Sequence, residues 1–293
     1  MGAKPYEELP DKPKLAAPKP AAPKRRAERE PVPPGSRQVK IARLGEAQTA
    51  LAVAALAVGP PTDKFGGGWV DNVPIFRGEH IPPPEDAPPN TRGRSTGLAC
   101  LRPHIWLHDD VINASFHLLD ARSQAAIDAT LPKCHFMETN FYTKLAEGAS
   151  GYSFASVRRW TRKVDVFTKD MIMVPIHCHG NHWTLALINL KAKRFEYYDS
   201  LRGSADRVLE HLRQWLEDEH EDKKKAPYDT SGWTDIVWKS GTPEQENGCD
   251  CGVFLVCTAD YLARDARLDF TKADMEHYRL RMVYQLIQQQ MLP

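Results

Sequence analysis

The stretch QENGCDCGVF, residues 245–254, places a cysteine on each side of one aspartate, just before an apolar segment. Cys251 falls in the first turn of the helix predicted for that segment, where unpaired backbone N–H groups and the helix dipole favour an anion. A thiolate is such an anion, and this position is known to lower the pKa of a cysteine. Cys249 lies in the preceding loop, and Cys257 falls on a helix face that we expect to be core. Cys251 is therefore the best candidate nucleophile of the three.

A thiol nucleophile needs a base and a further group that orients the base. His182 opens the apolar run HWTLALINL, and Asp199 lies near the end of the next run, RFEYYDS. If both runs are strands of one antiparallel hairpin, the start of the first lies beside the end of the second, and His182 meets Asp199 at one edge of the sheet. An acyl intermediate also needs donors for its oxyanion. The side-chain amide of Gln245 and the backbone N–H of Cys251 are the candidates.

A zinc site is the alternative interpretation of the same region. The histidines and the cysteine of PIHCHGNHW are residue types that bind zinc: His177, Cys178, His179 and His182. Their spacing matches no closed four-ligand pattern, and a chain that uses His182 as a base cannot lend it to a metal. We therefore expect no metal and no other cofactor.

The elements that must position these residues mix strands with helices. Short apolar runs bounded by polar turns predict buried strands, and longer runs with helical spacing predict helices. Strands are expected at residues 171–177, 182–190, 194–200 and 234–240, and helices at 104–123, 206–219, 252–266 and 274–292. In this assignment Trp106 lies on the first helix. Because the order shows no steady βαβ alternation, it predicts an α+β domain with a mixed central sheet.

The N-terminal part differs in composition from the rest. Residues 1–40 are rich in proline and in basic residues and poor in large apolar ones, so we predict that they are disordered. A short helix is expected at 41–58. The chain thus divides into a Pro-rich, basic and largely disordered region, 1–96, and a catalytic domain, 97–293. The basic segment 23–29 (PKRRAER) is a candidate nuclear address, with a solvated basic tail as the alternative.

The composition also argues against several classes of protein. The chain has 293 residues, a net charge of +1 and six cysteines. A nearly neutral chain gives no general reason to expect nucleic acid as a partner. No apolar run approaches the length of about 18 residues that a membrane span requires. Six cysteines in a chain without an evident signal peptide indicate a reducing compartment and free thiols.

Several stretches resemble the conserved boxes of one peptidase family. HWTLALINL, YYDS and QENGCDCGVF are similar, in this order, to the His, Asp and Gln–Cys boxes of the SUMO-specific (Ulp/sentrin-protease) cysteine peptidases. WLHDDVIN resembles the tryptophan box near the start of that domain, and the similarity covers residues 98–292. The resemblance implies a papain-like α+β fold with the nucleophile at a helix N-terminus. It also implies isopeptidase or processing activity on SUMO. Separately, we expect a monomer that is located in the nucleus or also in the cytoplasm.

By the same resemblance, four residues take catalytic roles. His182 would be the base, Asp199 its orienter, Cys251 the nucleophile and Gln245 an oxyanion donor. These are the roles that the residue types and their spacing indicate without the family.

Three further residues match positions that contact the modifier. Trp106 and Trp183 would close over its Gly-Gly tail, because only glycines fit between two indole rings. Asp109 matches a position that pairs with a basic residue on the modifier. Two residues depart from the family pattern: His108 stands where asparagine is typical, and Cys249 where a small polar residue is usual.

Three classes of function remain open at this point. The first is a SUMO protease, and the second is a protease for another ubiquitin-like modifier that uses the same machinery. The third is a YopJ-type acetyltransferase, which shares the His–acid–Cys order. The paired tryptophans and Gln245 favour hydrolysis. The modifier, the target proteins and the balance between maturation and deconjugation are not encoded in any of these motifs.

Overall fold

The computed structural model describes residues 43–58, 69–70, 73–74, 97–126, 128–149, 151–205 and 207–292. All of them belong to one compact unit, residues 33–293. The predictions of a disordered segment at 1–40 and of a nuclear address within it lie outside the described residues.

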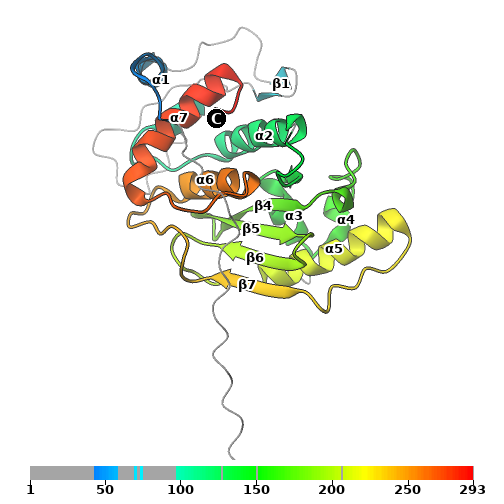
Figure 1. Ribbon diagram of the computed structural model, residues 1–293. Coiled ribbons are helices and arrows are strands. Elements are labelled where there is room, and N and C mark those ends of the chain that lie inside the picture. Colours follow the sequence, from blue (N-terminus) through cyan, green and yellow to red (C-terminus); the bar gives the residue numbers. More distant parts are fainter. Residues whose placement is uncertain are drawn as a thin grey trace, which may run out of the picture. The chain divides into compact units, whose positions relative to one another are not determined.

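A mixed five-stranded sheet forms the centre of the fold, with the strands in the order β3–β4–β5–β6–β7 (Figure 1). The strands are β3 (Cys134–Phe136), β4 (Met171–Cys178), β5 (His182–Asn189), β6 (Arg194–Tyr198) and β7 (Thr234–Trp238). The middle three pair antiparallel, whereas β3 and β7 add to the two edges in parallel. The predicted α+β class with a mixed sheet is confirmed. Two very short strands, β1 (Trp69–Val70) and β2 (Val73–Pro74), form a separate ribbon.

Helices cover both faces of this sheet (Figure 1). The α-helices are α1 (Glu46–Val58), α2 (Asp109–Ala125), α3 (Asn140–Leu145), α4 (Phe154–Val157), α5 (Val208–Lys224), α6 (Cys251–Ala263) and α7 (Met275–Gln288). Three short 3₁₀ helices complete the described elements: η1 (Gly97–Leu101), η2 (Val166–Thr168) and η3 (Lys272–Asp274).

The two faces of the sheet build two hydrophobic cores, because side chains alternate along a strand. On β4, Met171 and Met173 belong to the core shared with α2, α6 and α7, whereas Ile172 and Val174 belong to the core shared with α3 and α5. Burial on both faces explains why the strands read in sequence as continuous apolar runs.

The helix that begins at Cys251 is buried along its whole length. All 13 residues of α6 are buried, which matches its apolar sequence on every side. Near its C-terminal end the buried carboxylate of Asp260 binds Arg122 of α2 and Arg264. Burial alone would raise the pKa of Asp260, but these two guanidinium groups hold it below its usual range. The ion pair with Arg122 thus holds α6 against α2 in addition to packing.

Three features differ from the predictions made from the sequence. α2 begins at Asp109 with His108 at its N-cap, so Trp106 precedes the helix and does not lie on it. The helix expected at 206–219 continues further, and α5 ends only at Lys224. β3, α3 and α4 are absent from the prediction, because they have only 3, 6 and 4 residues. Elements so short show no periodicity that a sequence can reveal.

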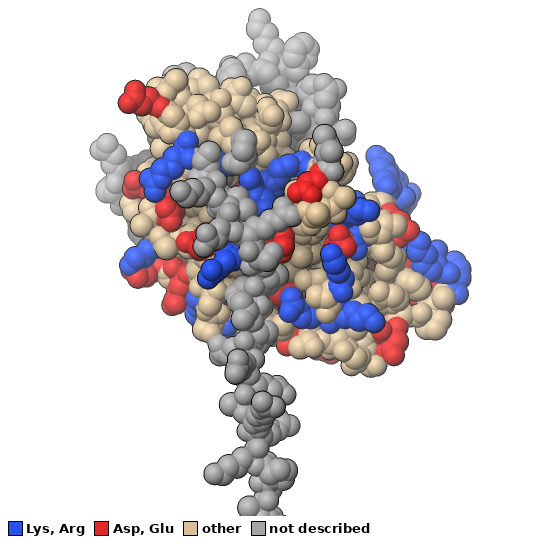
Figure 2. Space-filling model, in the orientation of Figure 1, with Lys and Arg blue, Asp and Glu red and all other residues tan. Residues whose placement is uncertain are grey.

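Charges of both signs are interspersed on the face of the molecule drawn in Figure 2. Lys and Arg side chains gather where α5 ends, but some of them are paired there. Arg158 binds Asp222, and Lys224 binds Asp165. Among the described helices, none combines the length and the apolar character needed to cross a membrane.

Candidate active site

The hairpin of β5 and β6 brings His182 and Asp199 together, as its sequence predicted. β5 begins at His182, and Asp199 follows directly after the last residue of β6. The two strands pair antiparallel, with Leu185 opposite Tyr198. His182 Nε2 lies 2.7 Å from Asp199 Oδ1, so the two side chains share a strong hydrogen bond where β5 begins and β6 ends.

The carboxylate of Asp199 is held by backbone groups on its other side. The N–H of Leu201 donates to Oδ1 at 2.7 Å, and the N–H of Gly203 donates to Oδ2 at 2.9 Å. A Cβ at residue 203 would come within 2.4 Å of Oδ2, so only glycine allows this approach. Burial raises the pKa of Asp199, but His182 and the two backbone donors outweigh it and keep the pKa below its ordinary value. The carboxylate is therefore ionised and fixed in direction.

The imidazole of His182 is arranged to carry a positive charge. Burial lowers its pKa, but the hydrogen bond to Asp199 and the interaction with the Cys251 sulfur outweigh this effect and raise the pKa to about 10. Because Nε2 faces Asp199, Nδ1 is the nitrogen left for Cys251. The site is thus electrostatically suited to an imidazolium beside a thiolate.

Cys251 is the first residue of α6, and its side chain is buried beside the sheet. Its backbone N–H belongs to the first turn, where no carbonyl of the helix is available to accept it. Cys249 is also buried, but it lies in the loop before the helix. Burial and the neighbouring Asp250 raise the pKa of the Cys249 thiol, and its sulfur lies 3.4 Å from Asn247 Oδ1. Of these two thiols, Cys251 is the one that has the environment of a nucleophile.

The amide of Gln245 is buried and fixed next to this loop. Its Oε1 accepts a hydrogen bond from Ser200 Oγ at 2.6 Å, and its Nε2 donates to the Asn247 carbonyl at 2.7 Å. Its own backbone N–H donates to the Ser200 carbonyl. Nε2 carries two hydrogens, and the Asn247 carbonyl takes one of them. The second N–H is what an oxyanion beside Cys251 would use.

Asn247 organises the loop, and the sequence analysis did not identify it. Its Oδ1 accepts the backbone N–H groups of Cys249 and Asp250 at 3.0 and 3.1 Å, and its Nδ2 donates to the Asp250 carboxylate. Asparagine before glycine is a common turn signal, because its side chain hydrogen-bonds to the backbone that follows. That signal predicts a turn at this position, but it does not reveal that the turn positions the N-terminus of α6 beside the sheet.

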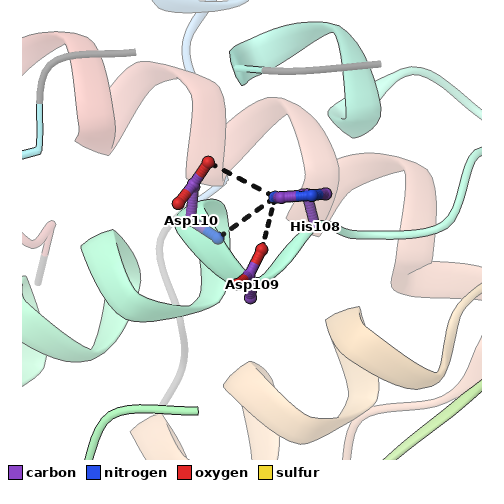
Figure 3. A group of neighbouring side chains, drawn as sticks. All are labelled: His108, Asp109 and Asp110. Carbon is purple, nitrogen blue, oxygen red and sulfur yellow. Dashed lines mark hydrogen bonds and ion pairs between the residues drawn. The ribbon is translucent and has the colours of Figure 1, made fainter. Parts of the chain in front are cut away.

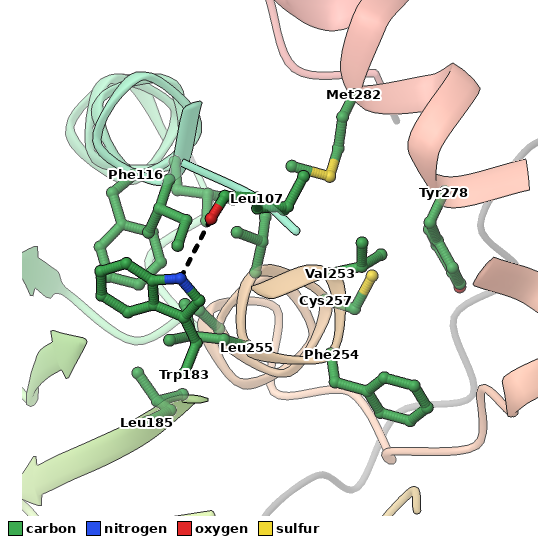
Figure 4. Close-up of a cluster of buried hydrophobic side chains, with 14 of the residues drawn as sticks. Leu107, Phe116, Trp183, Leu185, Val253, Phe254, Leu255, Cys257, Tyr278 and Met282 are labelled. Carbon is green, nitrogen blue, oxygen red and sulfur yellow. Dashed lines mark hydrogen bonds between the residues drawn. The ribbon is translucent and has the colours of Figure 1, made fainter. Parts of the chain in front are cut away.

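The indole of Trp183 lies against the segment that carries Trp106. Trp183 Nε1 donates to the Leu107 carbonyl at 3.1 Å (Figure 4). Trp183 is buried, whereas Trp106 is half-buried. On its outer side Trp183 is covered by His177, whose ring stacks on it at 4.2 Å. The two tryptophans predicted to close over the Gly-Gly tail are therefore linked through Leu107, which follows Trp106 in the chain and accepts the indole N–H of Trp183.

His108 and Asp109 form a pair beside this segment (Figure 3). His108 Nδ1 lies 2.5 Å from Asp109 Oδ1 and 3.3 Å from Asp110 Oδ2. Hydrogen bonds to Asp109 and then Asp110 raise the pKa of His108 to about 9, so its ring is charged at neutral pH. Among the described residues, these three are the one group whose ligand atoms lie close enough to share a metal ion. The imidazolium offsets one of the two carboxylate charges, and a protonated imidazole has no lone pair to offer a metal ion.

Residues 105–291 match the Ulp1 protease family, C-terminal catalytic domain. The chain belongs to the Ulp1 protease family. Among its relatives, the Sentrin-specific protease of Caenorhabditis elegans is 42% identical over 195 residues, which are 67% of this chain and 27% of that protein. Ubiquitin-like-specific protease 1A of Arabidopsis thaliana is 40% identical over 195 residues, 65% of this chain and 38% of that protein. Sentrin-specific protease 2 of Homo sapiens is 37% identical over 203 residues, 69% of this chain and 33% of that protein.

Solved structures of Ulp1 protease domains share the fold. The C-terminal Ulp1 protease domain in complex with Smt3, the yeast orthologue of SUMO, matches with a TM-score of 0.64 at 23% identity, over 85% of this chain and 98% of that one. The Ulp1-like SUMO protease catalytic domain of Chaetomium thermophilum matches with a TM-score of 0.63 at 23% identity, over 88% and 95%. The Ulp1-family chain described here spans about 27–38% of the length of the relatives named above.

Proposed function

We propose that this chain is a SUMO-specific cysteine protease, which cleaves after the C-terminal Gly-Gly of SUMO in conjugates, in precursors or in both. The observation that carries the proposal is the position of His182. Its ring interacts with the Asp199 carboxylate on one side and with the Cys251 sulfur, at the start of α6, on the other.

In the proposed mechanism Cys251 attacks the carbonyl carbon of the last glycine. The thiolate forms a C–S bond, and the carbonyl oxygen takes the negative charge. The free N–H of Gln245 and the backbone N–H of Cys251 stabilise this oxyanion. His182 then gives its proton to the departing amine, the C–N bond breaks, and a thioester to Cys251 remains.

The second half of the reaction releases the modifier. His182 is now neutral, so it takes a proton from a water molecule that attacks the thioester. The tetrahedral intermediate collapses, the C–S bond breaks, and the glycine carboxylate leaves. Asp199 stays ionised throughout and stabilises the imidazolium each time it forms.

The choice of SUMO as substrate is supported by the relatives. Two of those named above are called sentrin-specific, and one Ulp1 domain was solved with the yeast orthologue of SUMO. Trp106 and Trp183 are proposed to enclose the Gly-Gly tail, and Asp109 to bind a basic residue on the folded part of the modifier. In the unbound chain Asp109 is occupied by His108, so binding would require the modifier to displace that ring.

We also propose that the enzyme acts in the nucleus. This proposal rests on the basic segment 23–29. A fluorescent fusion of the chain in which the three arginines of this segment are replaced by alanine should lose nuclear enrichment.

The test of the catalytic proposal uses SUMO with an electrophile at its C-terminus. The full chain is treated with this probe, and the modified peptide is identified by mass spectrometry. We expect the probe on Cys251, no adduct with Cys251→Ser, and a loss of turnover of at least about a thousandfold for that variant. Cys249→Ser is the matched control, and it should retain most of the activity. A probe attached to Cys249 would refute the assignment of the nucleophile.

The same experiment tests specificity when it is repeated with a panel of modifiers. Ubiquitin and other ubiquitin-like proteins with the same electrophile should react more slowly than SUMO. A SUMO probe with alanine in place of the last glycine should fail to react, because its methyl group would not fit between the indoles. Faster labelling by another modifier would leave the mechanism intact and exclude SUMO as the preferred substrate.

A further inference from the structure

A buried arginine on α7 reaches the loop that carries the nucleophile. Arg279 is only 2% exposed, and α7 lies against α6 (Figure 1). Its guanidinium donates to Asp250 Oδ1 from Nε at 3.0 Å and from Nη2 at 2.6 Å. Nη2 also donates to the Cys249 carbonyl at 3.2 Å. The side chain therefore binds both residues that immediately precede Cys251.

The remaining donors of Arg279 bind a second segment. Nη1 donates to the carbonyls of Cys100 and Arg102 at 3.1 and 3.0 Å. A guanidinium has five N–H groups, and these contacts use all five. Arg279 thus joins the loop before Cys251 to the segment that leads to Trp106, and a shorter or differently shaped side chain would not satisfy both.

The contact with Asp250 has a consequence for the N-terminus of α6. Asp250 occupies the N-cap position, where an aspartate commonly accepts the N–H groups of the first turn. Here its side chain makes no such cap. Its two oxygens instead bind Arg279 and the Nδ2 of Asn247. The N–H groups of the first turn are therefore left for an anion at Cys251.

The charge of Asp250 is also relevant to the thiolate. A carboxylate one residue away raises the free energy of a thiolate, and it does so more strongly in a buried site than in water. The charged and titratable groups around Cys251 are His182 from β5 with Asp199 behind it, Cys249 and Asp250 from the loop, and Arg279 from α7. In this set Arg279 is the cation in direct contact with Asp250.

We propose that Arg279 is a positioning residue for the nucleophile: it holds Asp250 away from the first turn of α6 and neutralises its charge beside the Cys251 thiolate. The inference rests on the proposed role of Cys251, and it deepens that role. Arg279 does not touch the substrate. It acts through Asp250 and the Cys249 carbonyl.

The test measures the titration of the Cys251 thiol in the full chain. The rate of alkylation by iodoacetamide is followed as a function of pH, and peptide mapping reports Cys251 and Cys249 separately. Arg279→Gln should raise the apparent pKa of Cys251 by on the order of one pH unit, because Asp250 becomes uncompensated. Asp250→Asn should shift it in the opposite direction. Arg279→Gln combined with Asp250→Asn should return it to the parent value or below.

Two further variants separate positioning from stability. Arg281→Gln is the matched control: it removes a second 2%-exposed arginine from the same helix, and a guanidinium nitrogen of Arg281 donates to the Leu292 carbonyl at the C-terminal end of the chain. It should lower the melting temperature without moving the titration of Cys251. Arg279→Lys keeps the positive charge beside Asp250, so the pKa of Cys251 should equal that of the parent. Its kcat should nevertheless be lower than that of the parent, because lysine cannot reproduce the forked contact of the guanidinium.

The outcomes distinguish this inference from the proposed function. If Cys251 is the reactive thiol but folded Arg279→Gln titrates like the parent, Arg279 has no positioning role. Equal shifts in Arg279→Gln and Arg281→Gln would also overturn the inference. If Arg279→Gln does not fold, the Asp250→Asn variant tests the inference instead. If the apparent pKa of Cys251 does not fall in that variant, the argument from the charge of Asp250 is refuted. Alkylation that maps to Cys249 in the parent would instead refute the proposed nucleophile.

Discussion

Asp199 shows how much of the site depends on single residues. Three donors meet its carboxylate, and the two backbone donors remain whatever happens at His182. The carboxylate is thus ionised before the imidazole is protonated, and it is the main attractive contribution that holds the pKa of His182 near 10 against the effect of burial. The charge of Asp199, and not merely its shape, therefore keeps the pKa of His182 raised.

We therefore predict a specific pH effect for Asp199→Asn. A raised pKa of His182 means that the imidazolium persists at neutral pH and is lost only as the pH rises toward about 10. Without the carboxylate this pKa falls, so the alkaline limb of kcat/KM should move to lower pH. The maximum should drop by at least about a hundredfold. The measurement is the pH profile of hydrolysis of a fluorogenic SUMO substrate.

The control for this variant is Asp235→Asn on the neighbouring strand β7. The carboxylate of Asp235 is about half-exposed and binds Arg213, away from His182. Its profile should coincide with that of the parent. An unchanged alkaline limb in Asp199→Asn would show that the carboxylate does not control the proton on His182.

At the scale of elements, the close approach of α6 to the segment before α2 sets the geometry of the site. Gly252 follows Cys251, and a Cβ at this position would lie 2.7 Å from the Cβ of Leu107 and 3.1 Å from its Cγ. Leu107 also receives the indole N–H of Trp183 (Figure 4). Glycine at this position therefore allows the first turn of α6 to approach the segment that carries Leu107.

Gly252→Ala tests this arrangement. In a helix, alanine is favoured over glycine by about 1 kcal/mol, so propensity alone predicts a more stable protein. The clash with Leu107 should reverse this sign, lower the melting temperature and reduce kcat/KM by about tenfold or more, because the segment of Trp106 must move. Thermal unfolding and SUMO hydrolysis are the measurements.

Gly232→Ala provides the matched comparison, since a Cβ at residue 232 meets no atom within 4 Å among the described residues. This variant should behave like the parent in both measurements. A stabilised and fully active Gly252→Ala would mean that the approach of α6 to Leu107 is not needed.

At the scale of the whole molecule, the chain before residue 97 contributes a helix to the catalytic unit. On α1, Ala52 is buried in the core that contains α6 and α7, and the Leu56 carbonyl accepts the guanidinium of Arg102. Just before α1, Arg43 pairs with Asp274. These contacts lie on the side of α7 and η1, away from the hairpin that carries His182 and Asp199.

Two truncations separate chemistry from stability. Removal of residues 1–42 should leave both kcat and the melting temperature unchanged, because it keeps α1. Removal of residues 1–96 should leave kcat unchanged but lower the melting temperature, by about 2–4 °C for each kcal/mol of packing lost. Thermal unfolding and steady-state kinetics on SUMO check both forms. A large loss of kcat in the longer truncation would mean that α1 supports the site through α7.

The strands and the helix that carry His182, Asp199 and Cys251 are predictable from the sequence, as are these three groups. Apolar runs buried on two faces predict β4, β5 and β6, and the position of Cys251 before an apolar segment predicts a helix N-terminus. The short turn between β5 and β6 then predicts that His182 meets Asp199. All of these inferences depend on interactions between residues that are close in the chain. Such interactions can be predicted from local propensity and from the periodicity of apolar residues.

Only the tertiary structure decided what surrounds these groups. The close approach of Gly252 to Leu107 follows from how α6 packs on a segment more than a hundred residues earlier in the chain. The five contacts of Arg279 depend on α7 crossing both the loop and η1. From the sequence alone, an arginine in a helix is expected to be exposed to solvent. Its hydrogen-bond acceptors are distant in the sequence, and the periodicity of the helix does not reveal them. Burial of that charge became possible only when two separate segments supplied all of its acceptors.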